Sequence, residues 1–349
     1  MAINTLDPLN ILLTGCAGFI GSRVGQLLLA EGHRVVGIDN LNDAYDARLK
    51  EWRLSQTQEW PSFSFKQLDI TDSQSLQEVF KTPGAGTSRP FDAVINLAAR
   101  AGVRQSMDDP KGFYETNVLG TLNLLELCRT AGIQKFVLAS SSSVYGDPDS
   151  QVESPTGSKD VTTRKLAEDL PTDRPVSPYA ASKKAAEELC YSYHHLYGLD
   201  VTAFRFFTVF GPAGRPDMSI FRFIKWIAEG EPVLVNGDGN QQRDFTYVED
   251  VARGIYAGLK SAGFETINLG GDRPVPLLQV ITLLEGILGR RAHIEHQPFH
   301  PADVRATWAD VSKAKDLLGW NPETTFEDGL KATANWYLEN RAFAQTLDL

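Results

Sequence analysis

The first part of the chain, up to about Phe207, alternates short apolar runs with helical patterns. Buried strands are indicated by the runs NILLT, HRVVGID, SFKQLDI, FDAVINLA and KFVLAS. Helices are predicted over 18–31, near 113–131 and near 179–197. This alternation is typical of βαβ crossovers in a parallel sheet, where functional residues gather at the carboxyl ends of the strands. The pattern therefore predicts an α/β fold.

A different texture begins after residue 207. Short strands, Gly and Pro turns and several helical stretches follow Gly211, without a second βαβ series. Residues 151–177 are polar and contain charges and prolines, which is typical of a long surface loop. We expect a Rossmann-type doubly wound domain over 1–207, with the polar segment as a surface loop. A smaller α+β substrate lobe is expected mainly over 208–349, with boundaries that interleave with the first domain.

Composition narrows the class of protein. Of the 349 residues, 42% are hydrophobic and 22% are charged, which is ordinary for a globular enzyme. The net charge of -10 argues against a nucleic-acid-binding surface, which needs a clustered excess of Lys and Arg. No apolar run approaches the length of a membrane span, and no signal-peptide pattern opens the sequence. We therefore expect a cytoplasmic protein with neither nucleic acid nor membrane as a partner.

Neither the cysteines nor the histidines are spaced like metal ligands. Cys16, Cys128 and Cys190 lie far apart and show no disulfide framework, so we expect reduced core residues. His194 and His195 are adjacent on a predicted helix and therefore point to different faces. We expect no bound metal.

A glycine-rich loop, GCAGFIG, follows the first predicted strand and opens a helix. In a dinucleotide-binding loop of this kind Gly15 permits the tight turn, Gly18 lets the backbone approach a pyrophosphate, and Gly21 allows close helix–strand packing. The helix N-terminus then faces the anion. An ordinary strand–turn–helix is the alternative, but this context favours a dinucleotide.

Acidic residues stand at the ends of the second and third predicted strands. Asp39 follows the glycine loop by about 20 residues, where a carboxylate accepts the two hydroxyls of an adenosine ribose and repels a 2′-phosphate. This favours NAD over NADP, although basic residues between 34 and 50 weaken the preference. Asp69, followed by Ile70, is either an adenine contact or a helix cap.

Tyr179 and Lys183 form a Tyr-x-x-x-Lys pair at the start of a predicted helix. Residues four apart are neighbours on one helical face, so the ammonium lies beside the phenol. We expect Lys183, together with a positive nicotinamide, to lower the pKa of Tyr179 from about 10 towards neutrality, where it serves as general base. The preceding strand ends in the hydroxyl run Ser140–Ser143, from which a hydroxyl can hold the substrate oxygen and relay its proton.

The same spacing occurs again at Tyr256 and Lys260, so spacing alone is weak evidence. Only Tyr179 follows a strand that ends in hydroxyls and precedes a helix-forming stretch. We expect Tyr179 to be catalytic and Tyr256 to be structural.

In combination, these motifs resemble the extended short-chain dehydrogenase/reductase family over nearly the whole chain. The resemblance rests on the glycine loop, Asp39, Asn117 in TNVLGT, the serine run before VYG, and the Tyr179 and Lys183 pair. Within this family, UDP-glucuronate 4-epimerases are similar to this chain in the segments ARAGVRQSMDDP, ASSSSVYG, SPYAASKKAAE, RFFTVFGPAGRPDM and QQRDFTYVEDVARG.

The resemblance implies a two-lobed enzyme that holds NAD and inverts C4 of a UDP-hexuronic acid. Tyr179 would take the C4 hydroxyl proton while the C4 hydride goes to the nicotinamide. A 4-keto sugar would then turn in the pocket and take the hydride back on its other face, so that no net redox occurs.

A 4-keto uronic acid readily loses carbon dioxide, so the site must restrain the carboxylate. Ser142, Ser143 and Thr208 are candidates for holding it near the ring plane. Arg215 is a candidate for anchoring the carboxylate or a phosphate.

Further contacts follow from the same resemblance. Arg243 matches the family position that contacts the diphosphate, Asp303 matches the one that contacts the uridine ribose, and Asn236 lines the nucleotide site. His300 departs from the Arg or Gln of many relatives in the diphosphate clamp. The helices near 113–131 and 179–197 would form the four-helix contact of a homodimer.

The predicted site thus comprises three sets of residues. The catalytic residues are Ser141, Ser142, Tyr179 and Lys183. The cofactor contacts are Gly15, Gly18, Phe19, Ile20, Gly21, Asp39, Asn40, Asn42, Asp69, Ile70, Leu97, Ala98, Ala99, Asn117, Ser140, Tyr179 and Lys183. The substrate contacts are Arg104, Ser142, Ser143, Thr208, Arg215, Asn236, Arg243 and Asp303.

Three alternatives to a uronate epimerase stay open. Thr208 stands where galactose-type epimerases usually carry Asn, which weakens the case for a neutral UDP-hexose epimerase. Ser143 stands where dehydratases and UDP-glucuronate decarboxylases usually carry an acidic residue, which weakens that assignment too. The non-enzymatic alternative is an NAD-binding regulatory protein, and the intact Tyr179 and Lys183 pair argues against it.

Overall fold

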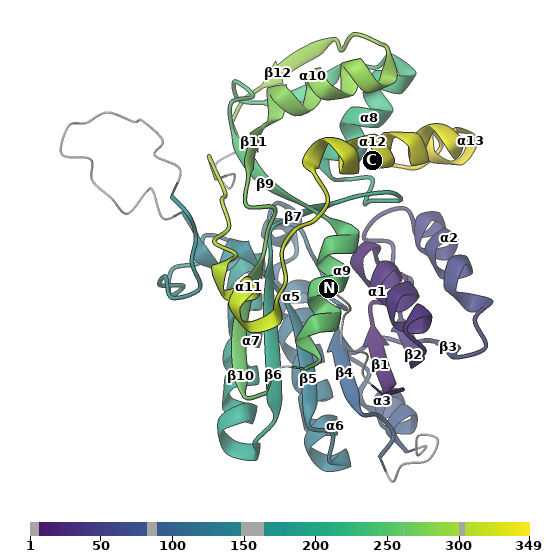
Figure 1. Ribbon diagram of the computed structural model, residues 1–349, viewed down its shortest axis with the longest axis vertical. Helices are drawn as coiled ribbons and strands as arrows, with labels where there is room; N and C mark the ends of the chain where they lie inside the picture. Colours follow the sequence, from purple (N-terminus) through teal and green to yellow (C-terminus); the bar gives the residue numbers. More distant parts are fainter. Residues whose placement is uncertain (1–6, 82–88, 148–163, 261, 300–303) are drawn as a thin grey trace, which may run out of the picture.

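Seven parallel strands form the centre of the larger of two lobes in the computed structural model (Figure 1). The model describes residues 7–81, 89–147, 164–260, 262–299 and 304–349. Starting from β1 (Asn10–Thr14), the chain builds one half of the sheet outward and then crosses back to build the other half, which places the topological switch between β1 and β4 (Ala93–Asn96). The strands in sheet order are β10 (Phe264–Leu269), β6 (Asp200–Phe206), β5 (Lys135–Ser141), β4 (Ala93–Asn96), β1 (Asn10–Thr14), β2 (Arg34–Asp39) and β3 (Phe63–Gln67).

Helices cover both faces of this sheet because successive strand residues point to opposite sides. In β1, Leu13 belongs to the hydrophobic cluster on one face and Leu12 to the cluster on the other. One face is covered by α1 (Phe19–Ala30), α2 (Ala47–Gln58), α9 (Val248–Gly258) and α11 (Ser312–Leu318). The other carries α3 (Ser73–Phe80), α4 (Gln105–Asp108), α5 (Pro110–Tyr114), α6 (Thr121–Ala131) and α7 (Pro178–Tyr197). The predicted Rossmann-type α/β fold is confirmed.

Local sequence signals explain the limits of the predicted helices. Ser177 caps α7 by accepting a hydrogen bond from the backbone N–H of Ala180 at 3.1 Å, Pro178 occupies the first turn, and Gly198 ends the helix with φ at 68°. The single helix predicted near 113–131 is interrupted. A π-helix, Glu115–Gly120, separates α5 from α6.

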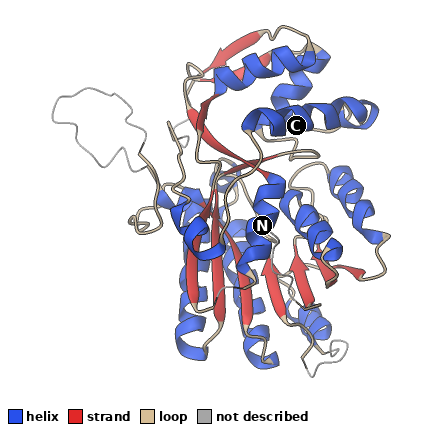
Figure 2. Cartoon of the chain, viewed as in Figure 1, coloured by secondary structure: helices blue, strands red, loops and turns tan. Residues whose placement is uncertain are grey.

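The smaller lobe has its own hydrophobic core and two short sheets (Figure 2). Helix α8 (Ser219–Glu229) is strongly amphipathic and contributes the buried side chains of Ile220, Phe223 and Ile227 to this core. The strands are β7 (Thr208–Phe210), β8 (Val233–Asn236), β9 (Gln242–Tyr247), β11 (Pro274–Pro276) and β12 (Ile294–Gln297). The helices are α8 (Ser219–Glu229), α10 (Leu277–Leu288), α12 (Phe326–Glu339) and α13 (Arg341–Ala344).

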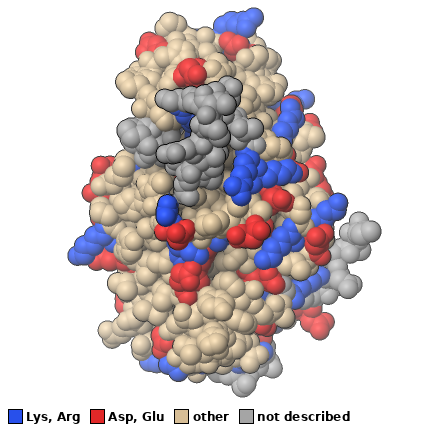
Figure 3. Space-filling view, turned by 90° about the vertical axis from the view of Figure 1, so that its left-hand side faces the viewer, with Lys and Arg blue, Asp and Glu red and all other residues tan. Residues whose placement is uncertain are grey.

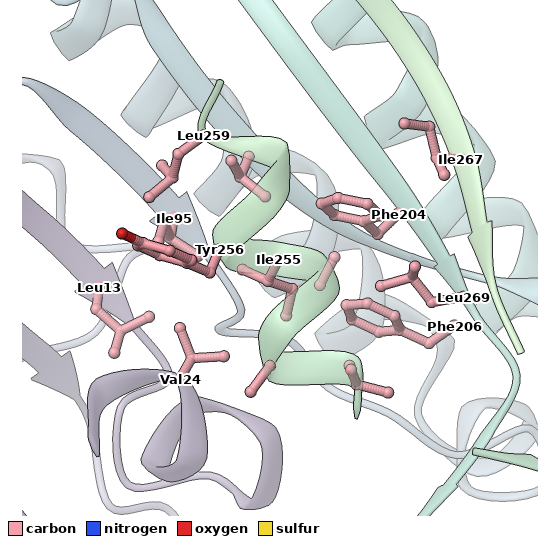
Figure 4. Packing of buried hydrophobic residues seen from close by; sticks show 14 of the residues in the cluster. Leu13, Val24, Ile95, Phe204, Phe206, Ile255, Tyr256, Leu259, Ile267 and Leu269 are labelled. Carbon is pink, nitrogen blue, oxygen red and sulfur yellow. The ribbon is translucent and has the colours of Figure 1, made fainter. Parts of the chain in front are cut away.

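Chain order and lobe membership interleave. Helix α9, strand β10 and helix α11 all follow residue 207, yet they belong to the larger lobe. Figure 4 shows α9 packed through Ile255 and Tyr256 between α1 and the strands, with Phe204 of β6 and Leu269 of β10 beside it. The larger lobe is therefore completed by segments from the second half of the chain.

The segment predicted as a surface loop over 151–177 is irregular and mostly exposed or half-buried in its described part, residues 164–177, but Leu166 is buried. Leu166 is 4% exposed and forms a parallel β-bridge with Ala309. Its N–H donates to the carbonyl of Trp308 at 2.7 Å, and its carbonyl accepts from the N–H of Asp310 at 3.0 Å. Because these bonds satisfy its backbone, this residue can be buried although it lies in a loop.

The three cysteines are free and buried, as predicted. Among the described residues, no group of His, Cys, Asp or Glu is arranged to hold a metal ion, and no helix is long and apolar enough to cross a membrane. On the face seen in Figure 3, basic and acidic side chains are interspersed and form no broad field of one sign.

Candidate active site

A cavity of about 620 Å³ lies where the carboxyl ends of the parallel strands meet the smaller lobe. The larger lobe contributes the glycine loop, the ends of β2, β4 and β5, and the start of α7. The smaller lobe contributes β7, the start of α8, β8 and β9. All described members of the three predicted residue sets line this cavity, with the exception of Asn117.

Glycine is required at two positions of the loop after β1. Gly15 has φ at 70°, and a Cβ there would lie 2.7 Å from the backbone nitrogen of Ala98. A Cβ on Gly21 would lie 2.0 Å from the carbonyl oxygen of Gly15. The turn and the first helix can approach each other this closely only without side chains, and the N-terminus of α1 then opens toward the cavity.

Asp39 is held at the end of β2 by two backbone groups. Its Oδ2 accepts from the N–H of Ala17 in the glycine loop at 3.2 Å, and its Oδ1 accepts from the N–H of Leu41 at 2.9 Å. The carboxylate thus lies against the glycine loop on the cavity wall. A carboxylate at the end of the second strand is where an adenosine ribose is expected. Asn40 and Asp69, which are hydrogen-bonded to each other at 2.6 Å, also line the cavity.

Lys50 is a basic residue of this end of the cavity. Its Nζ donates to the backbone and side-chain oxygens of Asn42 at 2.7 and 2.6 Å. Burial lowers the pKa of Lys50, while the nearby Asp39 carboxylate opposes that shift. The Lys50 ammonium is therefore held by hydrogen bonds to the loop after β2.

Tyr179 and Lys183 extend from the first two turns of α7 into the cavity. The ring of Tyr179 packs edge-on against Phe113 with centroids 6.0 Å apart. Lys183 is 5% exposed, and its Nζ donates to the carbonyl oxygen of Ala139 on β5 at 2.8 Å. The lysine therefore joins α7 to the strand that carries the serine run.

The predicted lowering of the Tyr179 pKa is not what the protein alone produces. Burial raises this pKa above its usual value, while a hydrogen bond with Ser141 and the positive charge of Arg215 act in the opposite direction. Burial also lowers the pKa of Lys183 to about 8, so its charge is costly to keep. The prediction concerned the site with NAD bound and stays a prediction, but desolvation of both groups opposes it in the protein alone.

Ser140 and Ser141 end β5, Ser142 and Ser143 follow it, and the four serines differ in their hydrogen bonds. The Ser140 hydroxyl donates to Glu187 at 2.5 Å, whereas the Ser141 oxygen accepts from the N–H of Ser143 at 3.2 Å and from its hydroxyl at 2.9 Å. Ser141 also bonds to Tyr179. Ser141 and Ser143 thus form a small hydroxyl network beside the phenol, and Ser142 lines the same cavity.

Thr208 and Arg215 line the cavity on the side of the smaller lobe. The Arg215 guanidinium forms a bidentate pair with Asp217 at 3.0 and 2.6 Å and donates to the carbonyl of Ala101 at 3.2 Å. It also lies over the ring of Tyr45, 5.3 Å from its centroid. Its charge is therefore already shared with a neighbouring carboxylate.

Arg104 and Asn236 meet across the cleft between the lobes. With the Asn236 amide turned so that both groups are satisfied, its oxygen accepts from Arg104 Nη2 at 2.5 Å. Arg243 lines the same region and donates to the carbonyl of Gln242 at 2.8 Å. The predicted contacts at His300 and Asp303 lie outside the described residues.

Comparison with known proteins places these features in a family. The sequence profile of the NAD dependent epimerase/dehydratase family matches residues 11–270. The chain belongs to this family. A UDP-glucuronate 4-epimerase of Thermodesulfobacterium geofontis is 54% identical over 94% of this chain and 96% of its own length.

Two solved structures of family members are similar over almost the whole chain. The UDP-glucuronic acid 4-epimerase of Bacillus cereus, in complex with UDP-glucuronic acid and NAD, has a TM-score of 0.83 at 36% identity, covering 95% of this chain and 99% of that one. A UDP-glucose 4-epimerase of Thermotoga maritima with UDP-glucose has a TM-score of 0.83 at 30% identity with the same coverage. The two neighbours carry different sugars, so overall similarity does not choose between uronate and neutral hexose.

The residues present fit NAD, the cofactor of this family. The glycine loop leaves no space for side chains at Gly15 and Gly21, and Asp39 presents a carboxylate at the end of β2. The cavity then runs from this carboxylate to Tyr179 and Lys183. A dinucleotide bound along it would bring its nicotinamide end to the catalytic pair.

Asn117, predicted as a cofactor contact, does not line the cavity. Its side chain accepts from the N–H of Arg100 at 2.9 Å and donates to the carbonyl of Arg100 at 3.0 Å and to Ser182 Oγ at 2.9 Å. It lies in the π-helix, which directs it toward the residue next to Lys183. Its role in this structure is to hold a loop and α7 together.

Other lining residues were missed by the sequence analysis. Tyr45 stands in the loop after β2, and its ring is contacted by three cations while its hydroxyl accepts from Arg53 at 2.7 Å. Arg222 and Gln241 line the cavity from the smaller lobe. For Tyr45 the available signal was its position after the carboxyl end of a strand. Arg222 and Gln241 had no comparable signal in the sequence. They reach the cavity only because separate segments of the smaller lobe come together there.

Proposed function

We propose that this protein is an NAD-dependent UDP-glucuronate 4-epimerase that forms UDP-galacturonate. The observation that carries the proposal is one continuous cavity that joins the dinucleotide loop, the Tyr179 and Lys183 pair, and a polar end with Ser142, Ser143 and Thr208. Relatives named UDP-glucuronate 4-epimerase cover nearly the whole chain, at 54% identity in one case.

The chain's own residues supply a base and an orientation. Tyr179 takes the C4 hydroxyl proton of the sugar, and Ser141, bonded to the phenol, holds the same oxygen and passes the proton. With NAD bound, we expect the Lys183 ammonium and the positive nicotinamide together to favour the phenolate of Tyr179. NAD held between the glycine loop and this pair would supply a reversible hydride acceptor for C4, so C4 could invert without net redox once the sugar had turned in the pocket.

The polar end of the cavity suits a substrate that must keep its carboxylate. Ser142, Ser143 and Thr208 offer hydroxyls to the carboxylate, and Arg215, which is paired with Asp217, lines the same cavity. Among the described lining residues near Tyr179, the acidic one is Asp217, which is paired with Arg215 at 2.6 Å. No free carboxylate is therefore placed there to promote an elimination or decarboxylation.

Product analysis tests the function directly. We expect the protein to convert UDP-glucuronate into UDP-galacturonate without release of carbon dioxide, as followed by anion-exchange chromatography and a carbon dioxide assay. Release of a UDP-pentose would identify a decarboxylase, and turnover of UDP-glucose alone would identify a neutral hexose epimerase. No turnover of any UDP-sugar by NAD-loaded protein would favour a regulatory NAD-binding protein.

We further propose that two copies associate through the outer faces of α6 and α7. Leu119 on the preceding π-helix and Tyr191, Leu196 and Tyr197 on α7 are each more than half exposed, which is unusual for so many large apolar side chains. Light scattering after size exclusion should give twice the chain mass of 38.5 kDa. Replacing Leu196 with Glu should produce monomers, and a monomeric wild type would contradict the proposal.

We infer a cytoplasmic location from the three free, buried thiols, which suit a reducing compartment. Fractionation of the source cells with an antibody against the protein tests this. Recovery in a membrane or extracellular fraction would contradict it.

A further inference from the structure

Glu187 is a buried carboxylate that the chemistry above leaves without a role. It follows Tyr179 and Lys183 at the same spacing of four on α7, so the three side chains lie on one face of the helix. Glu187 is 3% exposed and does not line the cavity. Burying an ionised carboxylate is costly unless it is paired, so its partners indicate what it does.

The carboxylate joins α7 to two strands. The guanidinium of Arg205 on β6 donates to it through Nε and Nη2, each at 2.9 Å. Ser140, at the end of β5, donates its hydroxyl to Oε1 at 2.5 Å. Ser140 lines the cavity and begins the serine run, so Glu187 fixes the end of the serine strand relative to the catalytic helix.

Several titratable groups face this carboxylate. On α7 itself, Lys184 Nζ lies 3.6 Å from Glu187 Oε2. Burial raises the pKa of the Cys190 thiol, and the negative charge of Glu187 adds to that shift. From β6 there is Arg205, whose guanidinium stacks 4.8 Å from the ring centroid of Tyr145, in the 3-10 turn after β5.

Lys183 is also buried and lies one helical turn before Glu187 on the same face of α7. Its ammonium has one carbonyl partner, Ala139, and burial lowers its pKa to about 8. Among the described residues, Glu187 is the charge that acts on Lys183 in the opposite direction and favours the cation.

We propose that Glu187 is a positioning residue of the active site, whose carboxylate keeps Lys183 cationic and fixes Ser140 against α7. This inference rests on the proposed function, because the Lys183 cation matters to catalysis only if Tyr179 is the base. A purely structural role in the ion pair with Arg205 would affect stability but not the ionisation of Lys183.

The first test compares Glu187→Gln with Glu188→Gln. Glu188 is the next residue, is exposed, and pairs with Lys184 at 2.6 Å, so its replacement removes the same charge from the same helix. In Glu187→Gln the alkaline limb of the kcat profile should move to lower pH by about one unit, because the cation is lost sooner. Glu188→Gln should keep the wild-type profile. Coincident limbs for the two variants would overturn the proposal.

A second measurement does not need turnover. The protein, freed of NAD, is treated with a small amine-acylating reagent between pH 6 and 10, and the peptide containing Lys183 is quantified by mass spectrometry. Labelling should reach half its maximum at a lower pH in Glu187→Gln than in the wild type and in Glu188→Gln. Unchanged labelling would overturn the proposal even if kcat fell.

Glu187→Asp covers the case in which the amide variant fails to fold. It retains the charge but is one methylene too short to keep both partners, so the labelling curve should stay near wild type while kcat falls. A labelling shift as large as that expected for a neutral residue would overturn the role of the charge. If wild-type protein fails to convert UDP-glucuronate, the proposed function fails, whereas the labelling comparison still decides whether Glu187 controls Lys183.

Discussion

The helices α7 and α9 carry the same Tyr-x-x-x-Lys spacing on opposite faces of one sheet, and only α7 presents it to the cavity. On α7, Tyr179 lines the cavity and Lys183 is buried beneath it. On α9, Tyr256 is 1% exposed within the hydrophobic core, and Lys260 lies on the surface just beyond the helix. The environment, not the spacing, therefore separates a reactive tyrosine from a structural one.

Position along the helix explains the difference. In a βαβ unit the helix N-terminus lies near the carboxyl ends of the strands, where ligands bind. Tyr179 is in the first turn of α7, next to its capping Ser177. Tyr256 comes eight residues after the start of α9, so it lies about 12 Å along the helix axis from the N-terminus of α9. It packs there against His33 and the middle of the sheet, as Figure 4 shows for its neighbours.

The largest expected effect separates the two tyrosines by activity. Tyr179→Phe should lower kcat for UDP-glucuronate by about 10³-fold, or about 4 kcal/mol, because the general base is removed. Tyr256→Phe should remain within about twofold of wild type, because it keeps the ring that fills the core. Steady-state rates at matched NAD loading measure both. Similar losses in the two variants would remove the distinction between α7 and α9.

The next largest effect concerns stability, for which Tyr256 should matter more than Tyr179. Tyr256→Ala should lower the free energy of unfolding by about 3 kcal/mol, since it leaves a cavity between α1, α9 and the sheet. The kcat per folded molecule should not change. Urea denaturation followed by circular dichroism checks the first point. A smaller loss in Tyr256→Ala than in Tyr179→Ala would indicate that Tyr256 is not a core residue.

Replacing the two lysines should also change stability by different amounts, and these changes should be smaller than that of Tyr256→Ala. The pKa of Lys183 falls from 10.5 to about 8 on folding, which corresponds to a cost of about 3 kcal/mol at neutral pH. Lys183→Met loses a hydrogen bond worth about 1 kcal/mol, so it should be more stable than wild type by about 2 kcal/mol while being much less active. Lys260→Met, a surface change, should stay within about 0.5 kcal/mol.

The stability gain of Lys183→Met should depend on pH in one direction. A folded pKa below the unfolded one means that the folded wild type binds fewer protons between pH 8 and 10.5, so its stability rises with pH in that window. The advantage of the variant should therefore shrink from pH 7 to pH 10 in protein freed of NAD. An advantage that grows with pH would contradict the assignment of a buried ammonium.

Much of this arrangement could be predicted from local sequence. Five of the seven strands of the parallel sheet, the glycine loop and the limits of α7 follow from apolar runs, from Gly15 and from the Ser177 cap, all of which act within a few residues. Strands β6 and β10 were not predicted. The cavity wall was predicted well for the same reason, since it forms at strand ends. The catalytic roles of its residues stay predictions.

The remainder depends on contacts between distant segments. Asn117 lies in a short π-helix and does not line the cavity. The spacing of apolar residues does not reveal such a π-helix, because only about one turn of the helix has altered hydrogen bonding. The burial of Leu166 depends on its pairing with Ala309, a residue far along the chain. Burial also raises the pKa of Tyr179 in the protein alone, and burial is a property of the assembled site.

The interleaving of the lobes constrains how such a protein can be divided or recombined. A fragment that ends at residue 207 would lack α9 and β10, so β6 would become a bare edge and the apolar side chains beneath α9 would face water. Such a fragment should aggregate. A chimera that exchanges only the sugar-nucleotide lobe between relatives would have to replace several separate stretches at once, so substrate range in this architecture is more readily altered by single substitutions in the cavity than by exchange of modules.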